Sequence, residues 1–366
     1  MENKRIVFLD YLRVTACFMV ILIHSIEPFY LEDGVLLRIA NKTDAIISTL
    51  LDSAIRAAVP LFVMTSSYLL FPVCISTRLF FEKRIKRVVI PLLVWSIFYL
   101  FTPIIMGDAN YSISSAVKHL LLNFNMQSAH LWFIYMLLGI YIVMPLLSPW
   151  VNKATRKEEK YFLIAWLFTT TVPFLHALAG HVFGREEILG EANWNEFGTL
   201  YYISGFIGYV VLGDYIRKYI DWDVKKTLKI CIPLLVVGYL ISVVWFWWAM
   251  PKDFPVRDDL RIAIYMEYSW RFCSFGVALC SFAIFMMFRL IKNGGCLYKT
   301  VVKLSKLSYG VYLVHLFILG IMYNIFYSMG MPTLSIILLT AVSTFIVSFV
   351  VIWLMSKLPK SKYIIG

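Results

Sequence analysis

Residues 6–30 read IVFLDYLRVTACFMVILIHSIEPFY, a mostly apolar run near the start of the chain. A helix rises about 1.5 Å per residue, so this run is long enough to cross the hydrocarbon core of a bilayer. It nevertheless carries four ionisable side chains, Asp10, Arg13, His24 and Glu27. Because ionisable groups are costly inside a membrane, they commonly mark a functional site. The run therefore predicts a membrane-spanning helix that carries such a site.

The spacing of Arg13 and His24 refines this prediction. They are eleven positions apart, about three helical turns, so they share one face of the helix and lie about 16 Å apart along its axis. An arginine near one membrane surface, in line with a histidine deep in the layer, indicates two binding positions for one elongated ligand. A structural alternative stays open, in which Arg13 extends to the membrane surface and His24 hydrogen-bonds to a neighbouring helix.

The composition extends the membrane prediction to the whole chain. Of the 366 residues, 60% are hydrophobic and 15% are charged, whereas soluble proteins carry about 25% charged residues. The 6 cysteines form no CxxC pair, which argues against a disulfide framework and against a zinc site, so we expect no metal. No small-residue cleavage site follows the basic start at Lys4 and Arg5, so we expect the first span to be uncleaved.

Ten apolar runs of about 20 residues are candidate membrane spans. They cover approximately residues 6–30, 54–74, 87–106, 131–150, 161–180, 199–216, 228–250, 269–291, 307–327 and 333–356. No run has a similar partner at a fixed offset, and no low-complexity linker divides the chain. We therefore predict an all-α polytopic membrane protein with about ten transmembrane helices, in a single domain over residues 1–366.

The positions of lysine and arginine predict the orientation. With a cytoplasmic N-terminus, the inner segments hold 24 of the 34 Lys and Arg residues and the outer loops hold seven. The positive-inside rule then places both termini in the cytoplasm. The net charge of +12 could suggest a nucleic-acid partner, but this placement explains the charge by membrane topology. We expect membrane lipids and no nucleic acid as partners.

A basic segment precedes the third predicted span, where residues 81–95 read FEKRIKRVVIPLLVW. Arg84 and Arg87 are three positions apart, so on a helix they project from one face, with Lys83 beside them. Guanidinium groups suit phosphate because they form bidentate hydrogen bonds with it and stay charged. The positive-inside signal alone, with or without bound anionic lipid, explains the same residues.

Four further polar residues occur in apolar surroundings. Arg56 lies at the outer start of the second span, and His130 and Trp132 lie at the outer interface of the fourth. His315 lies about two turns inside the cytoplasmic face of the ninth span. Helix packing and an interfacial aromatic belt explain each of them equally well.

Taken together, these motifs resemble acyltransferase family three, a family of ten-helix integral membrane enzymes. The resemblance rests on Arg13-x10-His24, LFVMTSSYLL at 61–70, Arg84-x-x-Arg87 followed by Val-x-x-Pro91, HLWF at 130–133 and SYGVYLVH at 308–315. It runs in order from residue 8 to about residue 350. The chain is most similar to small stand-alone members such as the O-acetyltransferase of enterobacterial common antigen. One departure is Ser67, where many members have glycine.

The resemblance implies transfer of an acyl group, usually acetyl, from cytoplasmic acyl-CoA to a hydroxyl of an extracytoplasmic glycan or lipid-linked sugar. It also implies a location in the bacterial inner membrane. The expected acyl-CoA contacts are Arg13, Lys83, Arg84, Arg87 and His315. The expected acceptor contacts are Arg56, His130 and Trp132.

We expect His24 to be the catalytic base, because a neutral imidazole can deprotonate an attacking hydroxyl. Glu27, one turn further on, would orient the ring. A covalent acyl-imidazole intermediate is an open alternative. A different class of function also remains: a proton-coupled secondary transporter that uses buried Arg, His and Glu. Such transporters usually contain paired repeats and broken helices, and the sequence shows neither.

Overall fold

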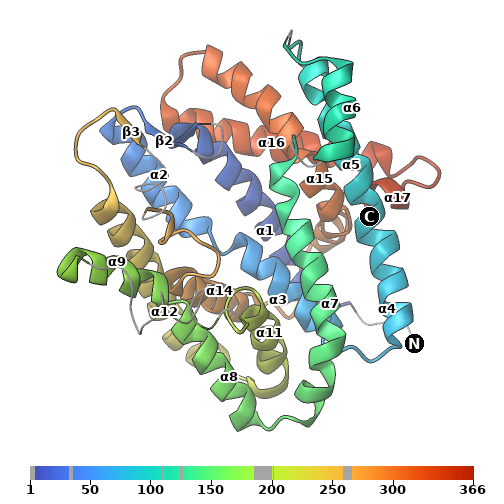
Figure 1. The fold of residues 1–366 in the computed structure, drawn as a ribbon. Coiled ribbons are helices and arrows are strands. Elements are labelled where there is room, and N and C mark those ends of the chain that lie inside the picture. The colour runs from blue at the N-terminus through green and yellow to red at the C-terminus, as the bar shows by residue number, and fades with distance from the viewer. Residues whose placement is uncertain are drawn as a thin grey trace.

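The computed structural model describes residues 5–32, 36–108, 110–123, 127–184, 200, 202–258 and 266–366 of the chain. Within these ranges the molecule is a helical bundle with one small sheet (Figure 1). The α-helices are α1 (Val7–Ile26), α2 (Lys42–Ile55), α3 (Ala58–Leu70), α4 (Thr77–Arg84), α5 (Ile90–Ile105), α6 (Ile113–Leu122), α7 (Trp132–Lys153), α8 (Arg156–Thr169), α9 (Val172–Phe183), α11 (Ile207–Tyr219), α12 (Val224–Ala249), α14 (Phe275–Phe288), α15 (Tyr298–Ser328), α16 (Thr333–Met355) and α17 (Lys362–Ile365).

Three short helical turns and three strands complete the described elements. The turns are the 3-10 helices η1 (Glu27–Phe29) and η3 (Ala129–Leu131) and the π-helix η2 (Ile85–Val89). The strands are β1 (Leu31–Glu32), β2 (Leu36–Ile39) and β3 (Val256–Asp258), in the order β1-β2-β3 with antiparallel pairing. Ile39 pairs with Val256, so the sheet ties the chain after α1 to the chain after α12.

The predicted all-α polytopic architecture is confirmed. Eight helical segments of the described chain are long and apolar enough to cross a membrane. The other two predicted spans, 199–216 and 269–291, coincide with the shorter helices α11 and α14. Their 13 and 14 residues extend about 20 Å, less than the roughly 30 Å of a hydrocarbon core. The apolar runs that predicted them continue into non-helical segments.

The first helix is central to the bundle. α1 packs against α3, α15 and α16, and Figure 1 shows it crossing the middle of the molecule. Its apolar stretch is 61% buried, against 22% for the peripheral helix α12. Leu12, Ala16 and Ile26 are completely buried. Because polar groups on such a helix face protein, its ionisable side chains can line internal cavities.

The outer helices present apolar side chains to the surroundings. On α16, Leu338, Val342, Ile346 and Val350 are all exposed and recur every four residues, which places them on one face. In a soluble protein, an apolar surface of this extent would be unfavourable, whereas in a bilayer it faces lipid. This face accounts for the apolar composition of the chain.

Ser67 lies where α3 packs closely on α11. Its hydroxyl donates to the carbonyl oxygen of Val210 at 2.5 Å. A Cβ atom added to Gly213 would lie 3.1 Å from the Ser67 Cβ, so the glycine that permits close packing here is supplied by α11. This arrangement accommodates serine where many members of the family that the sequence resembles have glycine.

Both ends of the described chain lie at the end of the bundle that carries the basic segment. Arg5 lines the same cavity as Arg84, and Lys362 lines a hollow with Lys86. The two termini therefore share one side, as the lysine and arginine count predicts. Placement of that side in the cytoplasm stays a prediction.

Labelling of single cysteines tests this orientation. In a background where the exposed cysteines Cys74 and Cys296 are serine, we expect an impermeant maleimide on intact cells to modify Asp253→Cys. Glu82→Cys should react only after the cells are opened. Both positions are exposed in the structure, so a difference reports sidedness and not burial. Modification of Glu82→Cys alone on intact cells would reverse the topology.

Candidate active site

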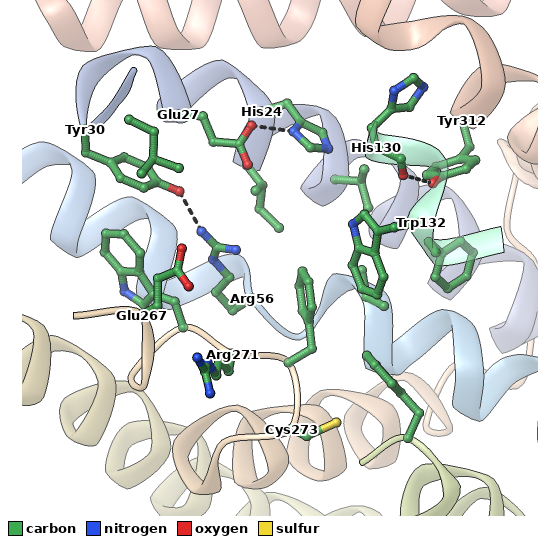
Figure 2. Close-up of a pocket in the computed structure, with 18 residues that line it drawn as sticks. His24, Glu27, Tyr30, Arg56, His130, Trp132, Glu267, Arg271, Cys273 and Tyr312 are labelled. Atoms are coloured by element: carbon green, nitrogen blue, oxygen red, sulfur yellow. Dashed lines mark hydrogen bonds and ion pairs between the residues drawn. The ribbon is translucent and has the colours of Figure 1, made fainter. Parts of the chain in front are cut away.

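Two cavities lie on either side of the midpoint of α1. The first, here called the histidine cavity, has a volume of about 430 Å³ and is lined by His24, Glu27, Arg56, His130 and Trp132, among others (Figure 2). The second, here called the arginine cavity, has a volume of about 680 Å³ and is lined by Arg13, Arg84 and Arg87, among others. Most of the candidate residues therefore line one of these two adjoining cavities.

His24 and Glu27 are hydrogen-bonded to each other at the end of α1. The Nδ1 atom of His24 lies 2.6 Å from Oε2 of Glu27, as the dashed line in Figure 2 shows. Because a carboxylate accepts and does not donate, Nδ1 carries a hydrogen, and in the neutral imidazole Nε2 then has a free lone pair. The His24 side chain is 18% exposed and lines the cavity. This arrangement of a carboxylate, an imidazole and an open Nε2 is typical of a general base.

Arg56 is held rigidly opposite this pair, at the junction of α2 and α3. Its Nη2 lies 2.6 Å from Oδ2 of the fully buried Asp52 and 2.6 Å from the Tyr30 hydroxyl. The guanidinium also lies 5.3 Å from the ring centre of Trp270. A guanidinium that is fixed in this way can donate hydrogen bonds to a polar ligand with little loss of side-chain entropy.

His130 is buried within the protein, in the turn that precedes α7, and its place at the outer membrane interface stays a prediction. Its side chain is only 5% exposed, because η3 turns inward and the Tyr312 hydroxyl donates to the His130 carbonyl oxygen (Figure 2). The ring lies 4.7 Å from that of Tyr99, edge to face. Neither ring nitrogen has a hydrogen-bond partner among the described residues. Apolar flanks predict an interfacial turn, but only tertiary contacts can show that it folds inward.

His315 lies well along α15, next to the other two histidines. The helix α15 begins at Tyr298, so His315 is about 17 residues from its start, or about 25 Å along the axis. Three lysines in the first turns of α15 lower the mean hydropathy there, so a hydropathy pattern does not show where the helix begins. The His315 ring lies 5.3 Å from that of His24 and 5.5 Å from that of His130. The structure therefore places it beside the histidine cavity and away from the arginines with which it was grouped.

Trp132 lies in the wall of the histidine cavity, as Figure 2 shows. Its ring is stacked on that of Phe272, with centres 5.5 Å apart and planes at 24°. Glu267 and Arg271 line the same cavity. Sequence reasoning missed these two because no motif marks them, and the predicted span 269–291 treated the loop before α14 as membrane helix.

The arginine cavity is strongly basic. Among the described residues, six cations line it and one carboxylate does, Asp10, which is paired with Arg5 at 2.7 Å. The cations are Arg5, Arg13, Arg84, Arg87, Arg217 and Lys306. Arg5, Arg217 and Lys306 were not predicted, because the chain segments that carry them meet only in the fold. Such a concentration of cations around one cavity favours an anionic ligand.

Arg13 and Arg84 are placed for ligand contact in different ways. No hydrogen bond joins Arg13 to another residue in the described part of the chain, and its side chain lines the cavity. Arg84 lies over the rings of Phe80 and Tyr141, 5.6 Å from each ring centre, which orients its guanidinium. Lys83 is exposed and lies outside the cavity lining, so the structure does not bring it together with the arginines.

The two cavities meet at a pair of aromatic rings. Among the described residues, Phe133 and Tyr312 line both cavities, and their ring centres are 5.4 Å apart, edge to face. Because α1 is continuous from Val7 to Ile26, it carries Arg13 into one cavity and His24 into the other. The two rings are in contact and separate the cavities, so a ligand that contacts both Arg13 and His24 must be long and must pass around this pair.

The partner of His24 can be tested separately from the base itself. We expect Glu27→Gln to lower the turnover number of the acyl transfer, from an acyl-CoA donor, that the sequence resemblance implies. The expected factor is about ten, which corresponds to the lower end of the free energy of a charge-assisted hydrogen bond, because the pair is partly exposed. The same variant should bind the donor as the wild type does, which calorimetric titration can check. A larger rise in KM than fall in kcat would instead place Glu27 in ligand binding.

Comparison with known proteins identifies the family. No curated protein and no solved structure matches the chain. The model of one family, described as an acyltransferase domain, matches residues 6–353. That range contains both cavities' candidate residues, from Arg13 to His315, and all the helices from α1 to α15. The chain therefore belongs to acyltransferase family three and is a membrane acyltransferase.

Proposed function

We propose that the protein transfers an acetyl group from acetyl-CoA to a hydroxyl of a glycan or lipid-linked sugar. The donor would come from the cytoplasm and the acceptor from the other side of a bacterial inner membrane. One observation carries the proposal: a single helix, α1, lines two cavities of complementary chemistry that meet at Phe133 and Tyr312. One cavity suits phosphates, and the other suits proton transfer.

The donor fits the arginine cavity. Acyl-CoA carries phosphates at one end and its thioester at the end of an extended arm. Guanidinium groups form bidentate hydrogen bonds with phosphate. Arg13, Arg84 and Arg87 all line this cavity. The arm then passes beside the rings of Phe133 and Tyr312, which line both cavities. The distance from Arg13 to His24 along α1, about 16 Å, is comparable to the length of the arm.

The reaction then takes place at His24. Nε2 takes the proton from the acceptor hydroxyl as the hydroxyl oxygen attacks the thioester carbonyl carbon. The carbon–sulfur bond breaks, and the imidazolium returns the proton to the leaving thiolate. Glu27, hydrogen-bonded to Nδ1 at 2.6 Å, stabilises the imidazolium between these steps. A two-step route through an acyl-imidazole uses the same residues.

The acceptor side of the histidine cavity combines aromatic and polar groups. Trp132 and Phe272 provide aromatic rings, while Arg56 and Glu267 provide hydrogen-bonding groups. Amphipathic rings together with a few fixed polar groups suit a sugar, whose faces are apolar and whose edges carry hydroxyls. Within the family, we propose an activity like that of the stand-alone O-acetyltransferases that modify enterobacterial common antigen.

An assay with labelled donor tests this function. Purified protein in lipid nanodiscs, given radiolabelled acetyl-CoA and a glycolipid extract of bacterial membranes, should move label to the glycolipid and release one free thiol for each acetyl group. Labelled acyl product should be absent without extract. A protein that neither binds acetyl-CoA nor releases thiol would exclude the proposal. Proton-coupled uptake of a solute by the same protein in liposomes would favour the transporter alternative.

A further inference from the structure

A second, smaller hollow lies beside the arginine cavity. It has a volume of about 220 Å³ and is lined by Lys86, Arg87, Lys362, Tyr363 and Gly366. We call it the C-terminal hollow. Three of its five lining residues have cationic side chains, and none of the described lining residues has an acidic side chain. The hollow therefore has the charge of an anion site.

The walls of the hollow are fixed by specific contacts of α17. The indole Nε1 of Trp95 donates to the Ile364 carbonyl oxygen at 2.9 Å, and Ile365 is buried against Gly310, where an added Cβ would lie 3.1 Å from the Ile365 Cβ. At Gly366, with φ of +91°, an added Cβ would lie 2.2 Å from the Tyr309 ring. These contacts hold Lys362 and Tyr363 opposite α5 and η2.

The facing wall is the π-helix η2, Ile85–Val89. Such a widened turn changes the direction in which successive side chains point, and it occurs often at functional sites. Here Lys86 lines the C-terminal hollow alone, whereas Arg87 lines both the hollow and the arginine cavity. The Tyr309 hydroxyl, which donates to the Val88 carbonyl oxygen at 3.1 Å, fixes this turn. The two basic spaces are thus neighbours that share Arg87.

We propose that the C-terminal hollow binds the phosphate on the ribose of coenzyme A, while the arginine cavity binds the diphosphate. This inference rests on the proposed function. Coenzyme A has anionic groups at two separate places, the diphosphate that leads to the arm and the 3′-phosphate on the ribose. Two adjoining basic spaces match this arrangement, and Arg87 lies between them. Nζ of Lys362 lies over the Tyr363 ring, 5.1 Å from its centre, which orients this cation beside the hollow.

Binding of two donors that differ in one phosphate tests the proposal. Titration of acetyl-CoA and of 3′-dephospho-acetyl-CoA into wild-type protein should show about tenfold weaker binding of the dephospho form. Lys362→Ala and Lys86→Ala should each weaken binding of acetyl-CoA, by up to about tenfold, and leave binding of the dephospho form unchanged. Both lysines are exposed, so these variants should fold. Lys303→Ala, an exposed lysine of α15 outside both linings, is the matched control.

The outcomes separate this proposal from the proposed function. Wild-type protein that binds both donors equally, or lysine variants that weaken both donors equally, would overturn the hollow as a 3′-phosphate site while leaving the acyltransferase reaction in place. Failure of wild-type protein to bind either donor would overturn the proposed function and this inference together.

An anionic lipid headgroup has the same phosphate chemistry, so the titrations are made in zwitterionic and in anionic nanodiscs. The proposal expects the preference for the 3′-phosphate to persist in zwitterionic lipid. Equal binding of the two donors in both lipids, with anionic lipid retained by wild type and lost by Lys362→Ala, would assign the hollow to lipid instead.

Discussion

His24→Ala is expected to lower the turnover number for acyl transfer by a factor of about 10²–10⁴, the usual contribution of a positioned general base. Nε2 of His24 is the nitrogen that can accept the proton of the acceptor hydroxyl, since Nδ1 is committed to Glu27 at 2.6 Å. Alanine removes this proton acceptor but leaves the arginine cavity unchanged. Steady-state kinetics with saturating donor measure the loss, and titration should give a nearly unchanged affinity for acetyl-CoA.

The neighbouring histidines make a control necessary. His315 and His130 lie close to His24, so removal of one ring can disturb the others. His181→Ala, an exposed histidine of α9 outside both cavities, should keep wild-type turnover. If His24→Ala keeps wild-type turnover at saturating substrate while it is folded and inserted, His24 is a structural residue, and the mechanism fails.

Much of the fold follows from local sequence properties. Apolar runs predict most of the helices because a membrane helix needs about 20 apolar residues in succession. Helical geometry alone places Arg13 and His24 on one face of α1, and the structure finds them in two cavities along that helix. The Arg84-x-x-Arg87 spacing likewise places both guanidiniums on one cavity.

The remainder depends on contacts between distant segments. His130 is drawn inward by Tyr312, 182 positions later in the chain, and nothing in the apolar flanks of His130 encodes this contact. The basic character of the arginine cavity depends on Arg217 and Lys306, which come from helices far apart in the sequence. Hydropathy also fails to locate the start of a helix whose first turns are charged, as α15 shows at Tyr298.

Arg84→Ala and Arg87→Ala are each expected to raise the KM for acyl-CoA about 10- to 150-fold, with much less change in kcat. A charge-assisted hydrogen bond contributes about 1.5–3 kcal/mol, which corresponds to this range. Phosphates make the same contact before and during the reaction, so loss of the contact weakens binding uniformly and does not slow the chemical step. Calorimetric titration of acyl-CoA measures the affinity, and steady-state kinetics measure kcat.

Lysine should replace Arg84 poorly. Arg84 lies over the rings of Phe80 and Tyr141. A lysine can neither stack in this way nor bind phosphate in a bidentate manner. Arg84→Lys should therefore restore little of the affinity for acyl-CoA. Arg78→Ala is the matched control, since Arg78 lies on α4, the helix that ends at Arg84, is 91% exposed and pairs with Glu82. Wild-type affinity in both alanine variants would mean that these arginines serve only topology, and His24 would then lack a route for its donor.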